Sequence, residues 1–227
     1  MRYERKYREE GLTLGEIQQI VRNHPMSFRR IHPDRQVNNV YFDTEDLHFF
    51  RENLYGVPDR HKIRLRWYGG DHLRADHAFV ELKCKHALLG EKFVAPAPRF
   101  LLRAGARLDT LLREAIQGLW QDDAVQRRAP GLMSLRLVPT LLNTYHRSYH
   151  ISHNGKFRLT IDRAMHSYGF TACQETHRIP SVDPALVVEV KYDAEYDEEF
   201  PPVGQGLPFR LSRNSKYVSG MLQAGNV

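Results

Sequence analysis

The feature that most constrains this chain is a strict alternation of charged and apolar residues from Lys62 to Trp67. In a β-strand successive side chains point to opposite faces, so Lys62, Arg64 and Arg66 share one face and the apolar residues share the other. The apolar face has to be covered by other parts of the protein. Three neighbouring cations on the other face repel one another unless water or an anion lies against them. The alternation therefore predicts a strand whose charged face needs a partner.

The same alternation recurs further along the chain. Glu81 and Lys83 share one face of a segment that starts at Phe79, and Glu189 and Lys191 share one face of a later segment. On a single strand, the simplest interpretation is an ordinary sheet face in contact with water. Because the pattern recurs, we expect the charged faces to point towards one another.

A β-hairpin is predicted around Asn154 and Gly155, a dipeptide that favours two-residue type I′ turns. The register set by this turn places Arg147 opposite Asp162 and brings Arg158 to the same face. Two arginines far apart in the sequence are thus expected to converge. The alternative is that Arg147 only pairs with Asp162 on a wet surface, an interaction of about 0.2–1 kcal/mol without functional meaning.

Helices are expected in four places, one of them a short helix over Glu45–Asn53 that follows a helix cap at the end of the strand Asn38–Thr44. Thr13 with Glu16 forms a capping-box pattern that predicts a helix to about Asn23. An apolar stripe predicts a helical region over residues 101–120, and the two prolines in residues 95–98 should end any regular element before it.

Near the end of the chain, Ser212 is the expected N-cap of a closing helix. Backbone N–H groups, Ser215 and Lys216 near the start of that helix would form a phosphate site, with a capped helix and a surface lysine as the alternative. The acidic stretch 193–202 before it is predicted to be a solvated loop.

The amino-acid composition indicates what kind of partner and which cellular setting to expect. The chain of 227 residues has 33 Lys and Arg against 27 Asp and Glu, a formal charge of +6 and a pI near 9.4, which favours an anionic partner. With Cys84 and Cys173 as the sole cysteines, no disulfide framework can be inferred, so a reduced, cytoplasmic setting is the default. No apolar run approaches the ~20 residues of a membrane span. We expect a soluble protein.

Eight short segments carry a resemblance to a known family. They are Glu4–Tyr7, Val40–Asp43, Ile63–Gly69, Val80–Lys83, Tyr145–Arg147, Phe157–Asp162, Glu189–Lys191 and Ser215–Tyr217. In this order, and over nearly the whole chain, they resemble the VTC domain, the polyphosphate polymerase branch of the triphosphate tunnel metalloenzymes, which also include the CYTH enzymes. The resemblance implies a single tunnel domain over residues 1–227. Its expected fold is α+β, a closed antiparallel β-barrel of about eight strands that forms a basic tunnel, with helices packed outside.

The resemblance also implies a set of site residues. Those expected to bind phosphate are Lys6, Arg64, Arg66, Lys83, Arg147, Arg158, Lys191, Ser215 and Lys216. Six of them are expected to be catalytic as well: Arg64, Arg66, Lys83, Arg147, Arg158 and Lys191. Glu189 matches the metal-binding glutamate of the family, with Glu4 and Glu81 as secondary candidates. Carboxylate and phosphate oxygens are hard ligands, which suit Mn²⁺ or Mg²⁺.

The implied activity is transfer of the terminal phosphate of ATP to inorganic phosphate, pyrophosphate or a growing polyphosphate. CYTH enzymes begin with Glu-x-Glu-x-Lys, whereas this chain has Arg2 at the first of these positions and keeps Glu4, which favours the VTC branch. Hydrolysis of triphosphate or ATP in the same tunnel is the alternative, and a non-catalytic polyanion-binding domain is a more distant one. No nucleic acid is expected, because the basic residues alternate inside strands and no RNA or DNA motif is visible. The sequence names no protein partner.

Overall fold

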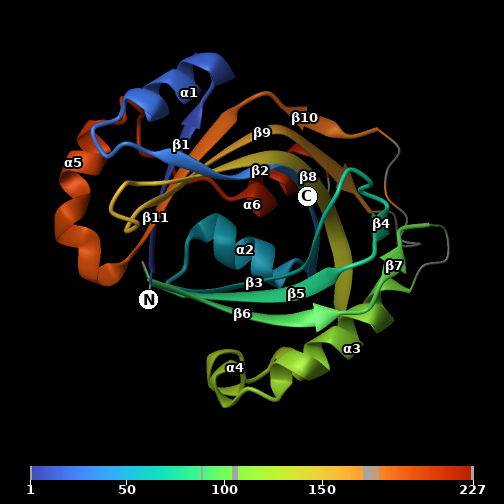
Figure 1. Cartoon of the computed structure of the whole chain (residues 1–227). Coiled ribbons are helices and arrows are strands. Elements are labelled where there is room, and N and C mark those ends of the chain that lie inside the picture. Colours follow the sequence, from blue (N-terminus) through green and yellow to red (C-terminus); the bar gives the residue numbers. More distant parts are fainter. Residues whose placement is uncertain (1, 88, 104–106, 171–175, 177–178, 226–227) are drawn as a thin grey trace. The chain divides into compact units, whose positions relative to one another are not determined.

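The structure is a computed structural model that describes residues 2–87, 89–103, 107–170, 176 and 179–225 (Figure 1). The chain divides into two compact units. Unit 1 comprises Met1–Arg35, Tyr145–Met165 and Asp183–Asn214, and unit 2 comprises Gln36–Thr144, His166–Val182 and Ser215–Val227. Four of the five unit boundaries fall inside the strands β2 (Arg29–Thr44), β8 (Leu137–Ile151), β9 (Arg158–Gly169) and β10 (Ser181–Asp183). The single domain expected from the sequence stays a prediction.

Unit 1 is built around three antiparallel strands, which are β1 (Arg2–Glu9), β11 (Leu186–Asp193) and β9. In their register Lys6 lies opposite Glu189, which lies opposite Thr160 in turn. Paired residues share a face, so the charged side chains gather on one side of these strands. The apolar side packs in one core with α1 (Leu14–Asn23), the 3₁₀ helix η2 (Ala194–Glu199) and α5 (Phe200–Gln205).

Two expectations about the helices of unit 1 have different outcomes. The capping box is confirmed, because the Thr13 side chain accepts from the Glu16 backbone N–H and the Glu16 carboxylate accepts from that of Thr13. The solvated loop expected over residues 193–202 is wrong, because η2 and the start of α5 occupy most of it. Tyr196 and Phe200 pack against the core there, and this burial stabilises regular structure in an acidic segment.

The hairpin of β8 and β9 has the predicted register but a different turn. Ser152 and Phe157 pair through their backbone, and Gly155 donates its N–H to the Ser152 carbonyl. Gly155 has a φ of 75°, whereas Asn154 does not take the positive φ that a type I′ turn requires. Instead, the Asn154 side chain accepts hydrogen bonds from Lys156 N–H and Ser152 Oγ, which stabilise a wider loop.

Unit 2 contains a four-stranded antiparallel arrangement in the order β2, β3 (Asp59–Tyr68), β5 (Ala78–His86) and β6 (Leu89–Ala97). Its apolar face packs in one core with α3 (Leu108–Trp120), which runs beside β6 in Figure 1. Smaller elements complete the unit: α2 (His48–Tyr55), β4 (Arg74–Ala75), β7 (Phe100–Leu101), α4 (Asp123–Arg128), the 3₁₀ helix η1 (Leu132–Ser134) and α6 (Lys216–Gln223).

Two boundaries in unit 2 were predicted wrongly. β6 continues through Pro96, which pairs with Phe79, because a proline next to the end of a strand removes at most one ladder hydrogen bond. The helix expected from Leu101 begins at Leu108, since β7 pairs with β4 before it. Residues 104–106 lie outside the described residues.

The predicted fold class is confirmed, because the chain is α+β with a large, mostly antiparallel sheet and helices packed on its apolar faces. None of the helices in the described part of the chain is long and apolar enough to cross a membrane. Cys84 is a free, buried thiol, and Cys173 lies outside the described residues.

Candidate phosphate and metal site

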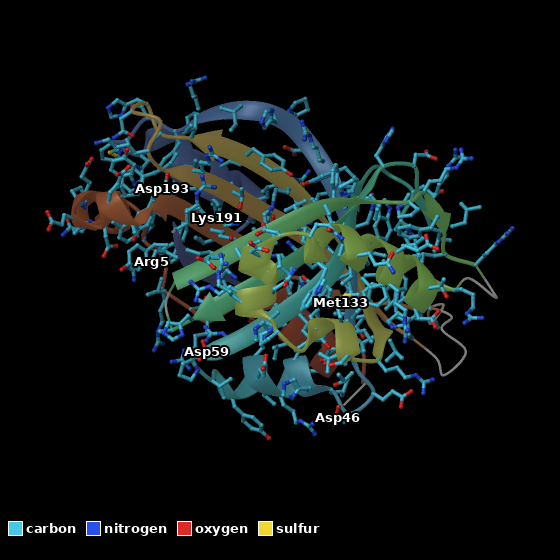
Figure 2. The ribbon with its side chains drawn as sticks, turned by 90° about the horizontal axis from the view of Figure 1, so that it is seen from below. Arg5, Asp46, Asp59, Met133, Lys191 and Asp193 are labelled. Carbon is cyan, nitrogen blue, oxygen red and sulfur yellow. The ribbon has the colours of Figure 1, made fainter. Side chains whose placement is uncertain are left out.

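On the charged face of unit 1, two lysines and two glutamates of β1 and β11 form a network of ion pairs. Lys6 Nζ lies 3.1 Å from Glu4 Oε1, and Lys191 Nζ lies 2.7 Å from Glu189 Oε1 and 3.8 Å from Glu4 Oε1. Lys6 also donates to the carbonyl oxygen of Asn214, 2.9 Å away. Lys191 is labelled on its strand in Figure 2. The structure thus brings together Lys6, Lys191 and the predicted metal ligands Glu4 and Glu189.

Arg147 on β8 is a buried member of the same network of charged side chains. Its guanidinium makes two hydrogen bonds to Asp162, of 2.6 and 2.7 Å, and lies 3.6 Å from Glu189 Oε2. The Tyr145 ring lies 5.2 Å from the guanidinium carbon. Arg147 is 8% exposed and Asp162 is 0% exposed, so the alternative of a wet surface pair is wrong. Arg158, in contrast, is exposed and lies opposite Lys191 on the same face.

The two glutamates of this network, Glu4 and Glu189, are held in the charged form. Burial favours the neutral form of Glu189, but Lys191, Lys6 and Arg147 outweigh it and hold its pKa well below the usual range. Burial and the neighbouring Glu189 raise the pKa of Glu4. Lys6 and Lys191 lower it by more, so that the pKa lies below its ordinary value. Two ionised carboxylates in contact are a suitable beginning of a metal site.

The donor set fits the Mg²⁺ or Mn²⁺ expected from the sequence. Thr160 Oγ1 is buried without a hydrogen-bond partner, and Thr160 lies opposite Glu189 on the charged face. Together with the Glu4 and Glu189 carboxylates, it supplies the hard oxygen atoms that these ions prefer. Within the described residues, no three of His, Cys, Asp or Glu come together as ligands of one ion. The other ligands would therefore be oxygen atoms of water and phosphate, as is usual for Mg²⁺.

On the charged face of unit 2, Glu81 binds the two predicted arginines. Arg64 donates to Glu81 Oε2 from Nε at 2.9 Å and from Nη2 at 2.5 Å, and Arg66 Nη1 lies 3.6 Å from Oε1. Tyr41 OH accepts from Arg64, and Asn39 Oδ1 accepts from Arg66. Glu81 therefore acts as a counter-ion in this structure, and its role as a metal ligand stays a prediction.

Cations outnumber carboxylates on this face. On β3, β5 and β6, the described residues that share the face by register include the cations Arg60, Lys62, Arg64, Arg66, Lys83, Lys85 and Lys92 and one carboxylate, Glu81. Lys83 is half-buried and lies between Lys62 and Lys92. Like charges this close repel one another strongly, so the face is suited to a polyanion.

The charge state of Glu81 leads to a pH prediction. Burial would raise the pKa of Glu81, but Arg64, Arg66 and Lys92 hold it far below its usual range. With a lower pKa in the folded than in the unfolded state, the carboxylate stabilises the protein above the unfolded value of about 4.3, and this contribution is lost as the pH falls. We expect Glu81→Gln to melt at lower temperature than the parent protein at neutral pH, and the difference to shrink on acidification. Melting curves between about pH 7 and about pH 3 that keep a constant difference would contradict this.

The start of α6 differs from its prediction. Ser215, and not Ser212, is the N-cap, because the Ser215 hydroxyl oxygen accepts from the Val218 N–H. Lys216 is the first residue of the helix and is half-buried. The predicted phosphate contacts of Ser215 and Lys216 stay a prediction.

The helix cap expected at the end of β2 belongs to a polar cluster whose connection to α6 sequence reasoning missed. Asp43 Oδ2 accepts from Tyr217 OH at 2.7 Å, and its two carboxylate oxygens also accept from the backbone N–H groups of Thr44, Phe49 and Phe50. Asp43 thereby caps α2, whose own N-cap residue, Leu47, provides no side-chain acceptor. Asp43 and Tyr217 each belong to a segment that carries the family resemblance, Val40–Asp43 and Ser215–Tyr217. The sequence therefore indicated that both segments matter, but it did not indicate that they are in contact.

Comparisons with known proteins identify the family. The family model of the VTC domain matches residues 1–224. The chain belongs to the VTC domain family. No curated protein matches the sequence of this VTC domain.

Solved structures share its fold at low sequence identity. A protein from Hippeastrum, described as a candidate adenylyl cyclase with a dominant triphosphatase activity, is 16% identical, with a TM-score of 0.53 over 99% of this chain and 96% of that one. A candidate adenylate cyclase from Vibrio parahaemolyticus is 12% identical, with a TM-score of 0.51 over 96% and 97%. One from Bacillus halodurans is 15% identical, with a TM-score of 0.53 over 95% and 94%. The VTC domain therefore has the fold of these proteins.

Proposed function

We propose that this VTC domain is a metal-dependent polyphosphate polymerase of the triphosphate tunnel type. The observation that carries the proposal is the excess of cations on the charged face of unit 2, where Glu81 is the counter-ion shared by Arg64 and Arg66. A chain of phosphate groups has the charge and the length to compensate a row of such cations. Membership of the VTC family supports polyphosphate as that chain.

The proposed reaction requires positioning and charge neutralisation more than a protein nucleophile. The bond between the terminal phosphorus of ATP and its bridging oxygen breaks, a bond to the acceptor phosphate oxygen forms, and ADP leaves. Arg147, Lys6 and Lys191 bind and orient phosphate oxygens and offset their charge. Mg²⁺ or Mn²⁺, when held by Glu4 and Glu189, supplies further charge neutralisation at those oxygens.

Hydrolysis is the second candidate, with water in place of the acceptor phosphate. The Hippeastrum protein of the same fold has a dominant triphosphatase activity, and the same cations and metal would serve such a reaction. The two activities differ in their products. Polymerisation releases ADP and builds internal phosphate groups, whereas hydrolysis releases orthophosphate.

The test is ³¹P NMR of the full chain incubated with ATP, Mg²⁺ and a trace of pyrophosphate. We expect signals of internal phosphate groups to grow as ADP accumulates. Glu189→Gln removes one charge of the metal site with little change of shape and should abolish the signals. Growth of orthophosphate alone would assign the domain as a triphosphatase. If no turnover occurs with Mg²⁺, or with Mn²⁺ in its place, both enzymatic candidates are wrong and the remaining candidate is a polyanion-binding domain.

Arg158 offers the cleanest test of a single phosphate contact, because its side chain is exposed on the charged face. We expect Arg158→Ala to lower kcat/KM about 10- to 100-fold, since loss of a charged hydrogen bond costs about 1.5–3 kcal/mol, with an unchanged melting temperature. Arg64→Ala should lower the rate similarly, but it also removes a partner of buried Glu81. The measurement is the initial rate of ADP release.

The matched control is Arg136→Ala, which removes an arginine whose side chain is 77% exposed and pairs with Glu45. It should keep the parent rate. Parent-like turnover of both Arg64→Ala and Arg158→Ala would exclude these residues from the site.

A further inference from the structure

A second polar site lies in unit 1, on the other face of β8 from Arg147. A cavity of about 200 Å³ opens there between α1, the start of β2 and β8. Ser148 and His150 line it from β8, and Gln18 and Arg22 line it from α1. Because successive strand residues alternate between faces, Ser148 and His150 point away from the face that bears Arg147. The cavity is therefore separate from the proposed phosphate and metal site.

Two buried polar atoms at the cavity have no partner in the described protein. Ser148 Oγ and His150 Nε2 are buried and make no hydrogen bond, and Ser148 as a whole is only 2% exposed. Buried polar side chains are nearly always hydrogen-bonded, so two such atoms around one cavity indicate something that binds there. Burial and the nearby Arg30 outweigh the opposing effect of the Asp34 carboxylate, lower the pKa of His150 and so favour its neutral form, which can donate or accept at Nε2.

The volume of the cavity and the charge of its lining residues indicate which kind of ligand it can bind. The volume is far above the ~15 Å³ that a single water needs and below the roughly 300–1,000 Å³ of drug-sized sites. Arg22 and Arg30 contribute positive charge, the latter also paired with Asp34, and no carboxylate belongs to the described lining. Val21 and Phe28 form the apolar part of the wall. A small anion with a compact body suits such a site.

We propose that this cavity binds a small anion through its phosphate or carboxylate group, with Ser148, His150 and Arg22 as the polar contacts. The site does not depend on the polymerase assignment, because it lies on another face and uses none of the proposed catalytic residues. Arginine and hydroxyl donors bind both phosphate and carboxylate oxygens, so both are tested.

The experiment follows the His150 imidazole nitrogens by ¹H–¹⁵N NMR of the full chain while sodium phosphate or sodium acetate is added. EDTA is present and sodium chloride keeps the ionic strength constant. His150→Phe assigns the signal. We expect a saturable shift, with Ser148→Ala and Arg22→Gln each weakening the apparent affinity at least about tenfold, as for loss of a charged hydrogen bond. Tighter binding of phosphate would indicate a phosphoryl ligand, and tighter binding of acetate a carboxylate; both support the proposal.

Arg158→Ala is the matched control, since it removes an exposed cation from the opposite, charged face and should leave the His150 response unchanged. Ser148→Ala removes a hydroxyl that makes no hydrogen bond in the protein, so this variant should fold as well as the parent. An unchanged His150 signal would mean that water fills the cavity and would overturn the proposal. Parent-like affinity in both Ser148→Ala and Arg22→Gln would also overturn it.

Discussion

Replacing Arg147 by alanine is expected to lower the free energy of unfolding by about 3–5 kcal/mol and to abolish turnover. The Arg147 guanidinium is the bidentate partner of Asp162, which is 0% exposed, and a neighbour of Glu189. Removing one partner leaves uncompensated carboxylates in a dry environment, where charge is costly. Urea denaturation of the parent and the variant measures the change.

Arg147→Lys separates charge from geometry. Lysine keeps the positive charge but cannot form two parallel hydrogen bonds with the Asp162 carboxylate, so we expect it to recover part of the lost stability and little of the activity. Arg2→Ala is the control, because Arg2 also binds an aspartate, Asp193, at 2.8 Å, but with half or more of its side chain exposed. A destabilisation by Arg147→Ala no larger than that by Arg2→Ala would contradict the importance of the buried pair.

Replacing Asp43 by alanine is the second change with a large expected effect. Five hydrogen-bond donors lose their acceptor: the N–H groups of Phe49 and Phe50 at the start of α2, the N–H and hydroxyl groups of Thr44 at the end of β2, and the buried Tyr217 hydroxyl. Each unsatisfied buried donor costs about 1–3 kcal/mol, and water entering the opened site relieves part of this, so we expect a loss of about 3 kcal/mol or more. The measurement is again the urea midpoint.

Tyr217→Phe tests the contacts of the Tyr217 hydroxyl, which donates to Asp43 and also lies 3.2 Å from Thr140 Oγ1. It removes the hydroxyl that donates to Asp43 and keeps the ring, which stacks on Tyr41 at a centroid distance of 4.9 Å. We expect a smaller loss of about 1 kcal/mol. Asp46→Ala, a change of an exposed aspartate a few residues away, should have little effect. Equal midpoints for Asp43→Ala and Asp46→Ala would show that the buried carboxylate does not hold α2 and α6.

The charged faces could be predicted from sequence because strand alternation is a local property. The charged strand faces that bear Arg64 and Glu81 followed from period-two patterns, and the pairing of Arg147 with Asp162 followed from the hairpin register. The capping box of α1 was visible for the same reason, since its two partners are three residues apart. Patterns confined to one or two neighbouring strands were therefore sufficient for the charged strand faces, whereas the candidate phosphate and metal residues came from the resemblance to the family.

The parts that were missed depend on contacts between distant segments. The bond between Asp43 and Tyr217 joins residues 174 positions apart, and no periodicity marks such a pair. Lys92, which binds Glu81, was missed because the prolines after it hid the strand β6, although the alternation of Lys92 and Val94 with Glu91 and Phe93 was present. The N-cap of α6 was misplaced by three residues, since both serines precede an apolar stretch and the tertiary packing decides between them.

The fixed geometry of Arg147 has a consequence for the entropy of ligand binding. Its guanidinium is already held by Asp162 and by the Tyr145 ring, so a phosphate bound there, as proposed, would not have to immobilise it. The exposed Arg158 side chain is less constrained in the ligand-free protein, and ordering such a long side chain costs about 0.5–1.5 kcal/mol. If phosphate binds as proposed, the ordering cost would therefore fall on residues near the surface such as Arg158, while the buried arginine would provide a fixed position for one phosphate group.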